Sequence, residues 1–203
     1  LTSQDLVDCV RDRFGLKKVG HAGTLDPLAS GLLIIGAGEG TKKLNSFLKL
    51  PKIYIADILL GESRTTGDME GEILEKVAVT DISREKVLQA LREITGELTL
   101  SVPRYSAIKL RGKPLYKYAR QGIVIESPKK KMKVRAARLR DLRCADGACV
   151  LSVELDVESG AYIRSIAEEI GRRLGYPAVL KDLRRIKAGD FNVEDASKIQ
   201  VSI

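Results

Sequence analysis

One stretch decides how the rest of the chain is interpreted: Lys18-Val19-Gly20-His21-Ala22-Gly23-Thr24-Leu25-Asp26-Pro27-Leu28-Ala29-Ser30-Gly31. It holds the one histidine of the chain, His21, and places Asp26 five residues later. Its glycines predict a loop over residues 19–31. Asp-Pro is a common turn dipeptide, so local chemistry favours a turn residue over a nucleophile by about two to one. A carboxylate can also act as a covalent nucleophile, and on these residues alone both interpretations stay open.

Helices and strands follow one another irregularly on both sides of this loop. Apolar spacing and capping residues predict helices over 3–14, 41–48, 83–95, 115–120 and 163–174. Apolar runs and alternation predict strands over 32–35, 52–60 and 149–158, and a polar loop over 63–71. Elements that are mixed in this way predict an α+β fold, with helices packed against a mixed sheet. No boundary divides the chain, so we expect one domain over residues 1–203.

Composition places the chain among ordinary globular proteins. Of its 203 residues, 44% are hydrophobic and 31% are charged. No segment approaches the roughly 20 apolar residues of a membrane span, and no secretory signal is visible. The three cysteines form no even framework, and with a single histidine they predict neither a disulfide scaffold nor a zinc site. We therefore expect a cytoplasmic protein without metal.

The net charge of +8 favours a polyanionic partner, because phosphate contacts by Lys and Arg release counterions. The basic residues are concentrated in a run that begins after Pro128 and enters a strand-like stretch: Lys129, Lys130, Lys131, Lys133 and Arg135. The run is equally consistent with the solvated face of a strand. Aromatic residues are 4% of the chain, which argues against a sheet that stacks many bases.

Two other classes of site fit the sequence poorly. The segment Gly36-Ala37-Gly38-Glu39-Gly40-Thr41-Lys42 has neither the spacing of a phosphate-binding loop nor that of a dinucleotide fingerprint. No Gly-x-Ser-x-Gly nucleophile elbow is present, so a serine hydrolase is disfavoured. Arg164 stands out because it lies at a predicted loop-to-helix junction, where a helix prefers anions. A nearby buried carboxylate would remove that conflict.

The chain resembles the TruB-type tRNA pseudouridine synthases. The resemblance begins with the stretch from Lys18 to Gly31 and returns in order over almost the whole chain. Its further segments are Gly38-Glu39-Gly40-Thr41-Lys42, Lys52-Ile53-Tyr54, Asp68-Met69-Glu70-Gly71, Val102-Pro103-Arg104-Tyr105-Ser106-Ala107-Ile108-Lys109, Leu115-Tyr116-Lys117-Tyr118-Ala119-Arg120-Gln121-Gly122, Ser159-Gly160-Ala161-Tyr162-Ile163-Arg164-Ser165 and Leu183-Arg184-Arg185.

This resemblance implies a largely antiparallel mixed sheet flanked by helices, with the active site in a central cleft. It implies isomerisation of a uridine in the T-loop of tRNA, at position 55, by a monomer without metal or organic cofactor. Asp26 is then the nucleophile, which attacks either the base or the sugar carbon, and Arg164 is its salt-bridge partner. Tyr54 stacks on the base and helps to remove a proton. The implied substrate contacts come from His21, Asp68, Tyr162 and Leu183, and the implied RNA contacts from Lys109, Lys129, Lys130, Lys131 and Arg184.

Some features depart from the family pattern. A strand that usually precedes residues 1–3 is not present, and the chain stops about where a C-terminal RNA-binding domain of the PUA type would begin. Ile53, Arg104 and Ala161 replace residues that are more usual at their positions, but none removes a catalytic group. The alternative function is a non-catalytic tRNA-binding or tRNA-folding protein on the same scaffold.

Overall fold

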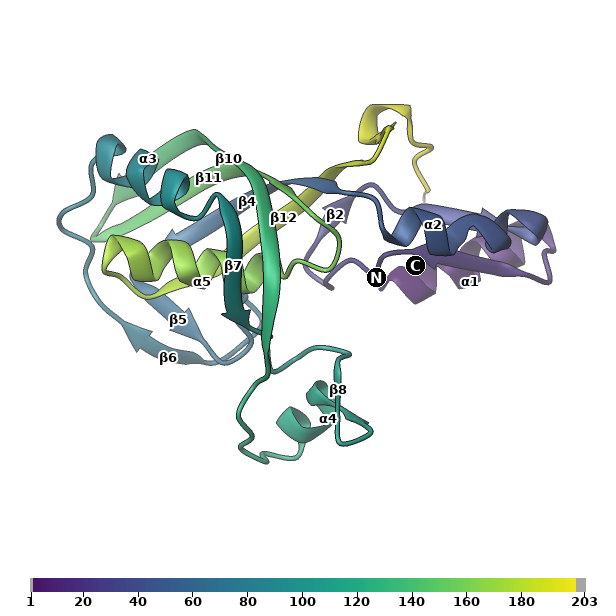
Figure 1. The fold of residues 1–203 in the computed structure, drawn as a ribbon, viewed down its shortest axis with the longest axis horizontal. Coiled ribbons are helices and arrows are strands. Elements are labelled where there is room, and N and C mark those ends of the chain that lie inside the picture. The colour runs from purple at the N-terminus through teal and green to yellow at the C-terminus, as the bar shows by residue number, and fades with distance from the viewer. Residues whose placement is uncertain (1, 200–203) are drawn as a thin grey trace.

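The computed structural model describes residues 2–199 and has an α+β architecture, as the sequence predicts (Figure 1). The helices are α1 (Ser3–Phe14), α2 (Leu44–Leu48), α3 (Arg84–Glu93), α4 (Leu115–Arg120) and α5 (Ile163–Leu174), with 3-10 helices η1 (Gly38–Lys43) and η2 (Val193–Asp195). The strands are β1 (Val19–Ala22), β2 (Ser30–Gly31), β3 (Ile34–Ala37), β4 (Lys52–Leu60), β5 (Glu62–Arg64), β6 (Ile73–Lys76), β7 (Gly96–Ser101), β8 (Lys109–Leu110), β9 (Lys113–Pro114), β10 (Lys129–Ala145), β11 (Ala148–Val157), β12 (Ala178–Ala188) and β13 (Phe191–Asn192).

A seven-stranded sheet forms the centre of the fold, with the order β13-β12-β4-β11-β10-β7 and with β2 beside β12. Every pairing in it is antiparallel except that of β2 with β12, which confirms the predicted mixed and largely antiparallel sheet. The strand predicted over 52–60 is β4, and the one predicted over 149–158 is β11. The sequence analysis did not identify β7 or β12.

One face of this sheet is the hydrophobic core. Strand β11 buries every second residue, and helices α3 and α5 pack onto the buried side through apolar residues such as Leu91 and Ile166. On the other face Glu154 pairs with Arg138 and Arg140, at 3.0 and 2.7 Å. The alternation that predicted one buried and one wet face for residues 149–158 is therefore confirmed. Helix α5 packs against β12 and β7.

The N-terminal segment forms a small layer at one end of the sheet. Helix α1 begins with a capping box between Thr2 and Asp5 and ends at Gly15, which has φ of 61°. Strands β1 and β3 then pair as a hairpin, with His21 opposite Ile35. The prediction of an unbroken loop over 19–31 was therefore wrong at its ends, because Val19–Ala22 pairs with the nearby β3 and Ser30–Gly31 pairs with the distant β12. The predicted strand over 32–35 is displaced to Ile34–Ala37.

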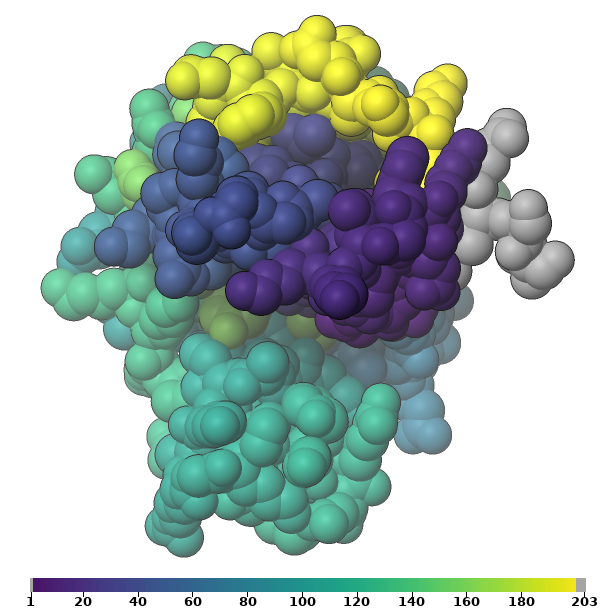
Figure 2. All heavy atoms as spheres, turned by 90° about the vertical axis from the view of Figure 1, so that its right-hand side faces the viewer, coloured from purple at the N-terminus to yellow at the C-terminus, as the bar shows by residue number. Residues whose placement is uncertain are grey.

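Residues 102–128 leave the sheet between β7 and β10 and carry β8, β9 and α4 (Figure 1). Figure 2 shows this teal segment facing the purple and blue residues of the N-terminal segment, with a hollow between the two. The residues that line this hollow come from both sides, for example Ser3 and Leu48 on one side and Tyr105 and Tyr116 on the other. This hollow is the central cleft that the resemblance implies.

Cys144 and Cys149 are joined by a disulfide across the end of the β10–β11 hairpin. The sequence analysis predicted no disulfide scaffold and did not identify this pair, which the Asp146-Gly147 turn brings directly opposite each other. Cys9 is free. Over residues 2–199, no helix is both long enough and apolar enough to cross a membrane.

Candidate active site

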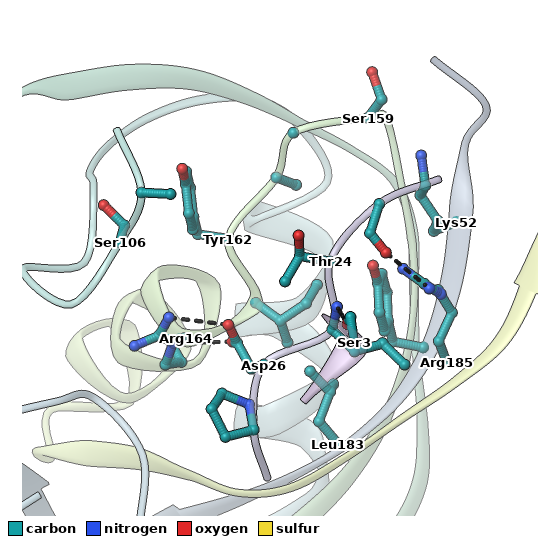
Figure 3. Close-up of a pocket in the computed structure, with 18 of the residues that line it drawn as sticks. Ser3, Thr24, Asp26, Lys52, Ser106, Ser159, Tyr162, Arg164, Leu183 and Arg185 are labelled. Atoms are coloured by element: carbon teal, nitrogen blue, oxygen red, sulfur yellow. Dashed lines mark hydrogen bonds and ion pairs between the residues drawn. The ribbon is translucent and has the colours of Figure 1, made fainter. Parts of the chain in front are cut away.

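Asp26 and Arg164 form a bidentate ion pair on one wall of the cleft (Figure 3). Nε of Arg164 donates to Oδ2 of Asp26 and Nη2 donates to Oδ1, both at 3.0 Å. The Asp26 side chain is 30% exposed whereas that of Arg164 is 6% exposed. The carboxylate is thus oriented from behind by a buried cation and is open to the cleft in front, where it is free to react or to bind.

The remaining donors of Arg164 are used by the surrounding loops. Nη1 donates to the carbonyl of Thr66 at 3.0 Å, and Nη2 donates to the carbonyl of Tyr105 at 3.2 Å. Oδ2 of Asp68 lies 3.5 Å from Nη1. Two carboxylates therefore balance the cation at the start of α5, which answers the electrostatic conflict noted for an Arg in the first turn of a helix.

The Asp26 loop is a genuine turn as well as the source of the carboxylate. The backbone N–H of Ala29 donates to the carbonyl of Asp26 at 2.8 Å. The N–H of Leu25 donates to Oγ of the buried Ser3 at 2.9 Å, which ties the loop to the first turn of α1. The turn interpretation of Asp-Pro is thus correct for the backbone, while the side chain remains available for Arg164.

Aromatic and apolar side chains complete a cavity of about 830 Å³ around Asp26. Tyr54 lies on the core face of β4 and Leu183 on the core face of β12, and both line the cavity. Tyr162, the residue directly before α5, lines it as well. Burial raises the pKa of both tyrosines, so each phenol stays neutral near neutral pH. A flat base could stack between such rings while its edge meets polar groups.

His21 lies in the same cavity, on strand β1. Burial lowers its pKa, and the positive charge of Arg185 lowers it further. Among the described residues, Nδ1 of His21 is buried and has no hydrogen-bond partner. Because Nδ1 is buried, any contact of His21 with a molecule in the cavity must come from another part of the imidazole.

Of the remaining predicted substrate-binding and RNA-binding residues, only Lys130 lines the cavity. Lys130 lines the cavity, where Nζ donates to the carbonyl of Gly160 at 2.9 Å and lies 5.5 Å from the Tyr162 ring centroid. Asp68 lies outside the cavity lining, buried beside Arg164, so its predicted contact with the nucleotide stays a prediction. Four predicted RNA contacts lie on exposed positions away from the cavity: Lys109 on β8, Lys129 and Lys131 on β10, and Arg184 on β12.

The sequence analysis missed Ser3, Lys52 and Arg185, which are all buried and all line the cavity. Nζ of Lys52 donates to the carbonyls of Leu48 and Leu50, at 2.7 and 2.6 Å, where helix α2 ends. The two-residue periodicity of a strand could have identified Arg185. It follows Leu183 by two residues, so in a strand the two side chains lie on the same face. Within residues 2–199, no group of three or more His, Cys, Asp or Glu side chains is arranged to hold a metal ion.

Comparison with known proteins gives consistent results. The model of the TruB family pseudouridylate synthases (N terminal domain) matches residues 11–163. The tRNA pseudouridine synthase B of Staphylococcus saprophyticus is 39% identical over 98% of this chain and 67% of that protein. The tRNA pseudouridine synthase B of Staphylococcus haemolyticus is 40% identical over 97% of this chain and 65% of that protein.

A solved structure shares the fold. The crystal structure of a Cbf5-Nop10-Gar1 complex contains a chain that matches with a TM-score of 0.69 and 28% identity, over 95% of this chain and 46% of that one. The pseudouridine synthase fold expected from the resemblance is thereby confirmed. The chain spans about two thirds of the length of the curated relatives it matches.

Proposed function

The chain belongs to the TruB family of pseudouridylate synthases, and we propose that it converts uridine to pseudouridine in the T-loop of tRNA, at position 55. The observation that carries this proposal is the Asp26 carboxylate, which Arg164 holds from behind and which faces a cavity with two tyrosines. Such a site offers a nucleophile and a stacking surface together. Two relatives that share 39% and 40% of aligned residues with the chain carry the name tRNA pseudouridine synthase B.

The proposed reaction breaks the bond between N1 of uracil and C1′ of ribose and forms a bond between C5 and C1′. Asp26 stabilises the separated state by a transient covalent bond, either to C1′ of the sugar or to the base, and leaves when the new bond forms. The proton lost from C5 is matched by the proton gained at N1. The reaction is a redox-neutral isomerisation whose atoms balance, so it needs no oxidant, reductant or second substrate, and we propose that it proceeds without metal or organic cofactor.

The uridine must leave its stack before Asp26 can reach it, which costs a few kcal/mol. Stacking of the extruded base on Tyr54 recovers part of that cost. Tyr54 can accept the proton of C5 only in its ionised form. Burial disfavours that form and raises the pKa of Tyr54, whereas the charge of the nearby Arg185 favours it. His21 helps to displace the base from the T-loop stack, while Tyr162, Leu183 and Asp68 position the extruded nucleotide.

The basic residues of β10 supply the non-specific part of RNA binding. Lys129, Lys130 and Lys131, with Lys109 and Arg184, would contact phosphates around the cleft. We further propose that the protein acts as a monomer in the cytoplasm. Sedimentation of the purified protein at several concentrations would test the monomeric state.

Pseudouridine mapping on unmodified tRNA tests the function directly. The expected result is pseudouridine at a single uridine of the T-loop, formed in the absence of any added metal or cofactor. Its loss from a tRNA with that uridine replaced by cytidine is the control. Tight binding of tRNA without any isomerisation would instead identify a tRNA-binding or tRNA-folding protein on the same scaffold.

A further inference from the structure

Arg185 is a buried cation that touches both ends of the nucleophile loop, residues 23–32. Its side chain comes from β12 and the residue is 1% exposed. Nε donates to the carbonyl of Leu32 at 2.7 Å, and Nη2 donates to the carbonyl of Gly23 at 3.1 Å. The backbone of Arg185 adds a further bond, because its carbonyl accepts the N–H of Leu32 at 2.8 Å. One residue therefore closes the loop that carries Asp26.

The loop is shaped to let Arg185 approach at both ends. Gly31 has φ of 98°, and a Cβ there would lie 2.2 Å from the carbonyl oxygen of Arg185. Gly23 has φ of 86°, and a Cβ there would meet Nη1 of Arg185 at 3.5 Å. Glycine at both positions permits a left-handed backbone, and at Gly31 it also leaves room for the backbone carbonyl of Arg185, so the loop packs closely against this residue.

Arg185 also faces the proposed base-stacking residue. In the β12–β4 pairing Arg185 is the direct cross-strand partner of Tyr54. Opposite residues of an antiparallel pair share a face and have neighbouring side chains. The charge of Arg185 counteracts the effect of burial on the pKa of Tyr54 and lowers the pKa of His21. Three elements of the cavity, the Asp26 loop, β4 and β1, thus meet at one guanidinium.

We propose that Arg185 is a positioning residue, which fixes the Asp26 loop relative to Tyr54 so that a uridine bound in the cavity meets both in one geometry. This inference rests on the proposed isomerase function and extends it to a residue that need not touch the substrate. The fork of the guanidinium carries this inference, because Nε and Nη2 donate to the two carbonyls from fixed positions in one plane, a geometry that the flexible ammonium of lysine does not reproduce. A displacement of about 1 Å at the nucleophile can lower the rate by about 10²-fold.

The test compares Arg185→Met, which loses charge and fork, with Arg185→Lys, which keeps only the charge. Lys181→Met is the matched control, since Lys181 is exposed on the same strand. Hydrogen exchange of the peptide that covers residues 23–32 reports the loop. The NMR titration of His21, the one histidine of the chain, reports the charge. Single-turnover rates and tRNA dissociation constants report function.

Both Arg185 variants should speed amide exchange in residues 23–32 and lower the single-turnover rate by about 10- to 10²-fold, with tRNA affinity changed less than about threefold. Arg185→Met should also raise the titration midpoint of His21, whereas Arg185→Lys should leave it in place. Unchanged exchange in the loop, or a lost rate explained wholly by weaker tRNA binding, would overturn the proposal. If Arg185→Met does not fold, Arg185→Lys alone decides, through faster loop exchange with an unshifted His21.

The exchange and titration arms do not depend on catalysis. A wild-type protein that never isomerises uridine would refute the proposed function, yet the loop and His21 would still show whether Arg185 holds this geometry. Fast isomerisation by the wild type together with a full rate in Arg185→Lys would refute the positioning role alone.

Discussion

The guanidinium of Arg164 and the carboxylate of Asp26, which are 138 residues apart in the chain, meet as a parallel fork with both bonds at 3.0 Å. The fork fixes the direction of the carboxylate as well as its charge, because both of its oxygens are held in the plane of the guanidinium. The start of helix α5 and the Asp26 loop are thereby one functional unit. We expect a substitution of Asp26 to lower mainly the reaction rate and a substitution of Arg164 to lower the free energy of unfolding.

Asp26→Asn should remove the proposed chemistry and leave the fold in place. Asparagine has nearly the same shape but is a far poorer nucleophile, so we expect the single-turnover rate to fall by at least about 10³-fold. The tRNA dissociation constant should change less than about threefold. Rapid-quench assays and binding measurements would check both values, with the exposed Asp12→Asn as the control. Full turnover by Asp26→Asn would exclude the nucleophile role.

Arg164→Met should be costly for stability, because it leaves the carboxylates of Asp26 and Asp68 without their shared cation. Breaking a buried pair in this way typically costs about 3–5 kcal/mol, and the partial exposure of Asp26 places the expected loss near the lower value. Urea unfolding measures the loss. Adding Asp26→Asn to Arg164→Met should recover part of it, since the two residues are coupled. Strictly additive effects would show that the pair contributes nothing jointly.

Tyr54→Phe separates the two roles proposed for Tyr54. Phenylalanine keeps the stacking surface, so the affinity for tRNA should be nearly unchanged. The phenol is lost, and if it takes part in proton transfer the rate should fall by about 10²-fold or more. Tyr54→Leu should in addition weaken binding of the extruded uridine. Equal rates for the wild type and Tyr54→Phe would restrict Tyr54 to stacking.

Local patterns in the sequence were sufficient for the amphipathic elements. Helices α1, α3 and α5 and strands β4 and β11 lie close to where capping residues and apolar periods predicted them. Strand β12 was missed because Lys181, Asp182 and Arg184 interrupt its apolar residues, and β-bulges on both sides of Leu183 and Arg185 disturb the alternation. The pairing of β2 with β12 depends on contacts about 150 residues apart, which no local pattern contains.

The candidate site was predicted in large part by the family resemblance, and the fold supplies what the resemblance did not. His21, Asp26, Tyr54, Tyr162, Arg164 and Leu183 all line one cavity. Arg185 was assigned to no site because the strand that carries it, β12, was not predicted. Its burial and its two carbonyl partners become visible only when β12 is placed beside the Asp26 loop.

The proposed contribution of β10 predicts a strong dependence of tRNA affinity on salt. Lys129 and Lys131 are exposed, and Lys131 is paired with Glu97 at 2.8 Å. Each lost phosphate contact should reduce the slope of log affinity against log salt by about 0.7–0.9. The double variant Lys129→Gln/Lys131→Gln, which loses one or two contacts, should therefore reduce the slope by about 0.7–1.8. Lys86→Gln on α3 is the control. An unchanged slope would remove β10 from the RNA interface.

The titration of His21 predicts how stability depends on pH. In the folded chain burial holds the pKa of His21 below its ordinary value of 6.5, and the charge of Arg185 acts in the same direction. The unfolded chain has the ordinary value, so between the two pKa values it binds a proton that the folded chain does not. The free energy of unfolding must therefore fall as the pH is lowered through this window, and the contribution of His21 is complete above it.

Urea unfolding of the wild type and of His21→Gln between about pH 5 and 7.5 isolates this effect, because glutamine does not titrate. The wild type should lose stability relative to the variant as the pH falls below 6.5, and the difference should level off below the folded pKa. The NMR midpoint of the imidazole gives that pKa independently. Identical pH dependence of the two proteins would mean that His21 titrates as it does in water, and the lowered pKa of His21 in the folded chain would be refuted.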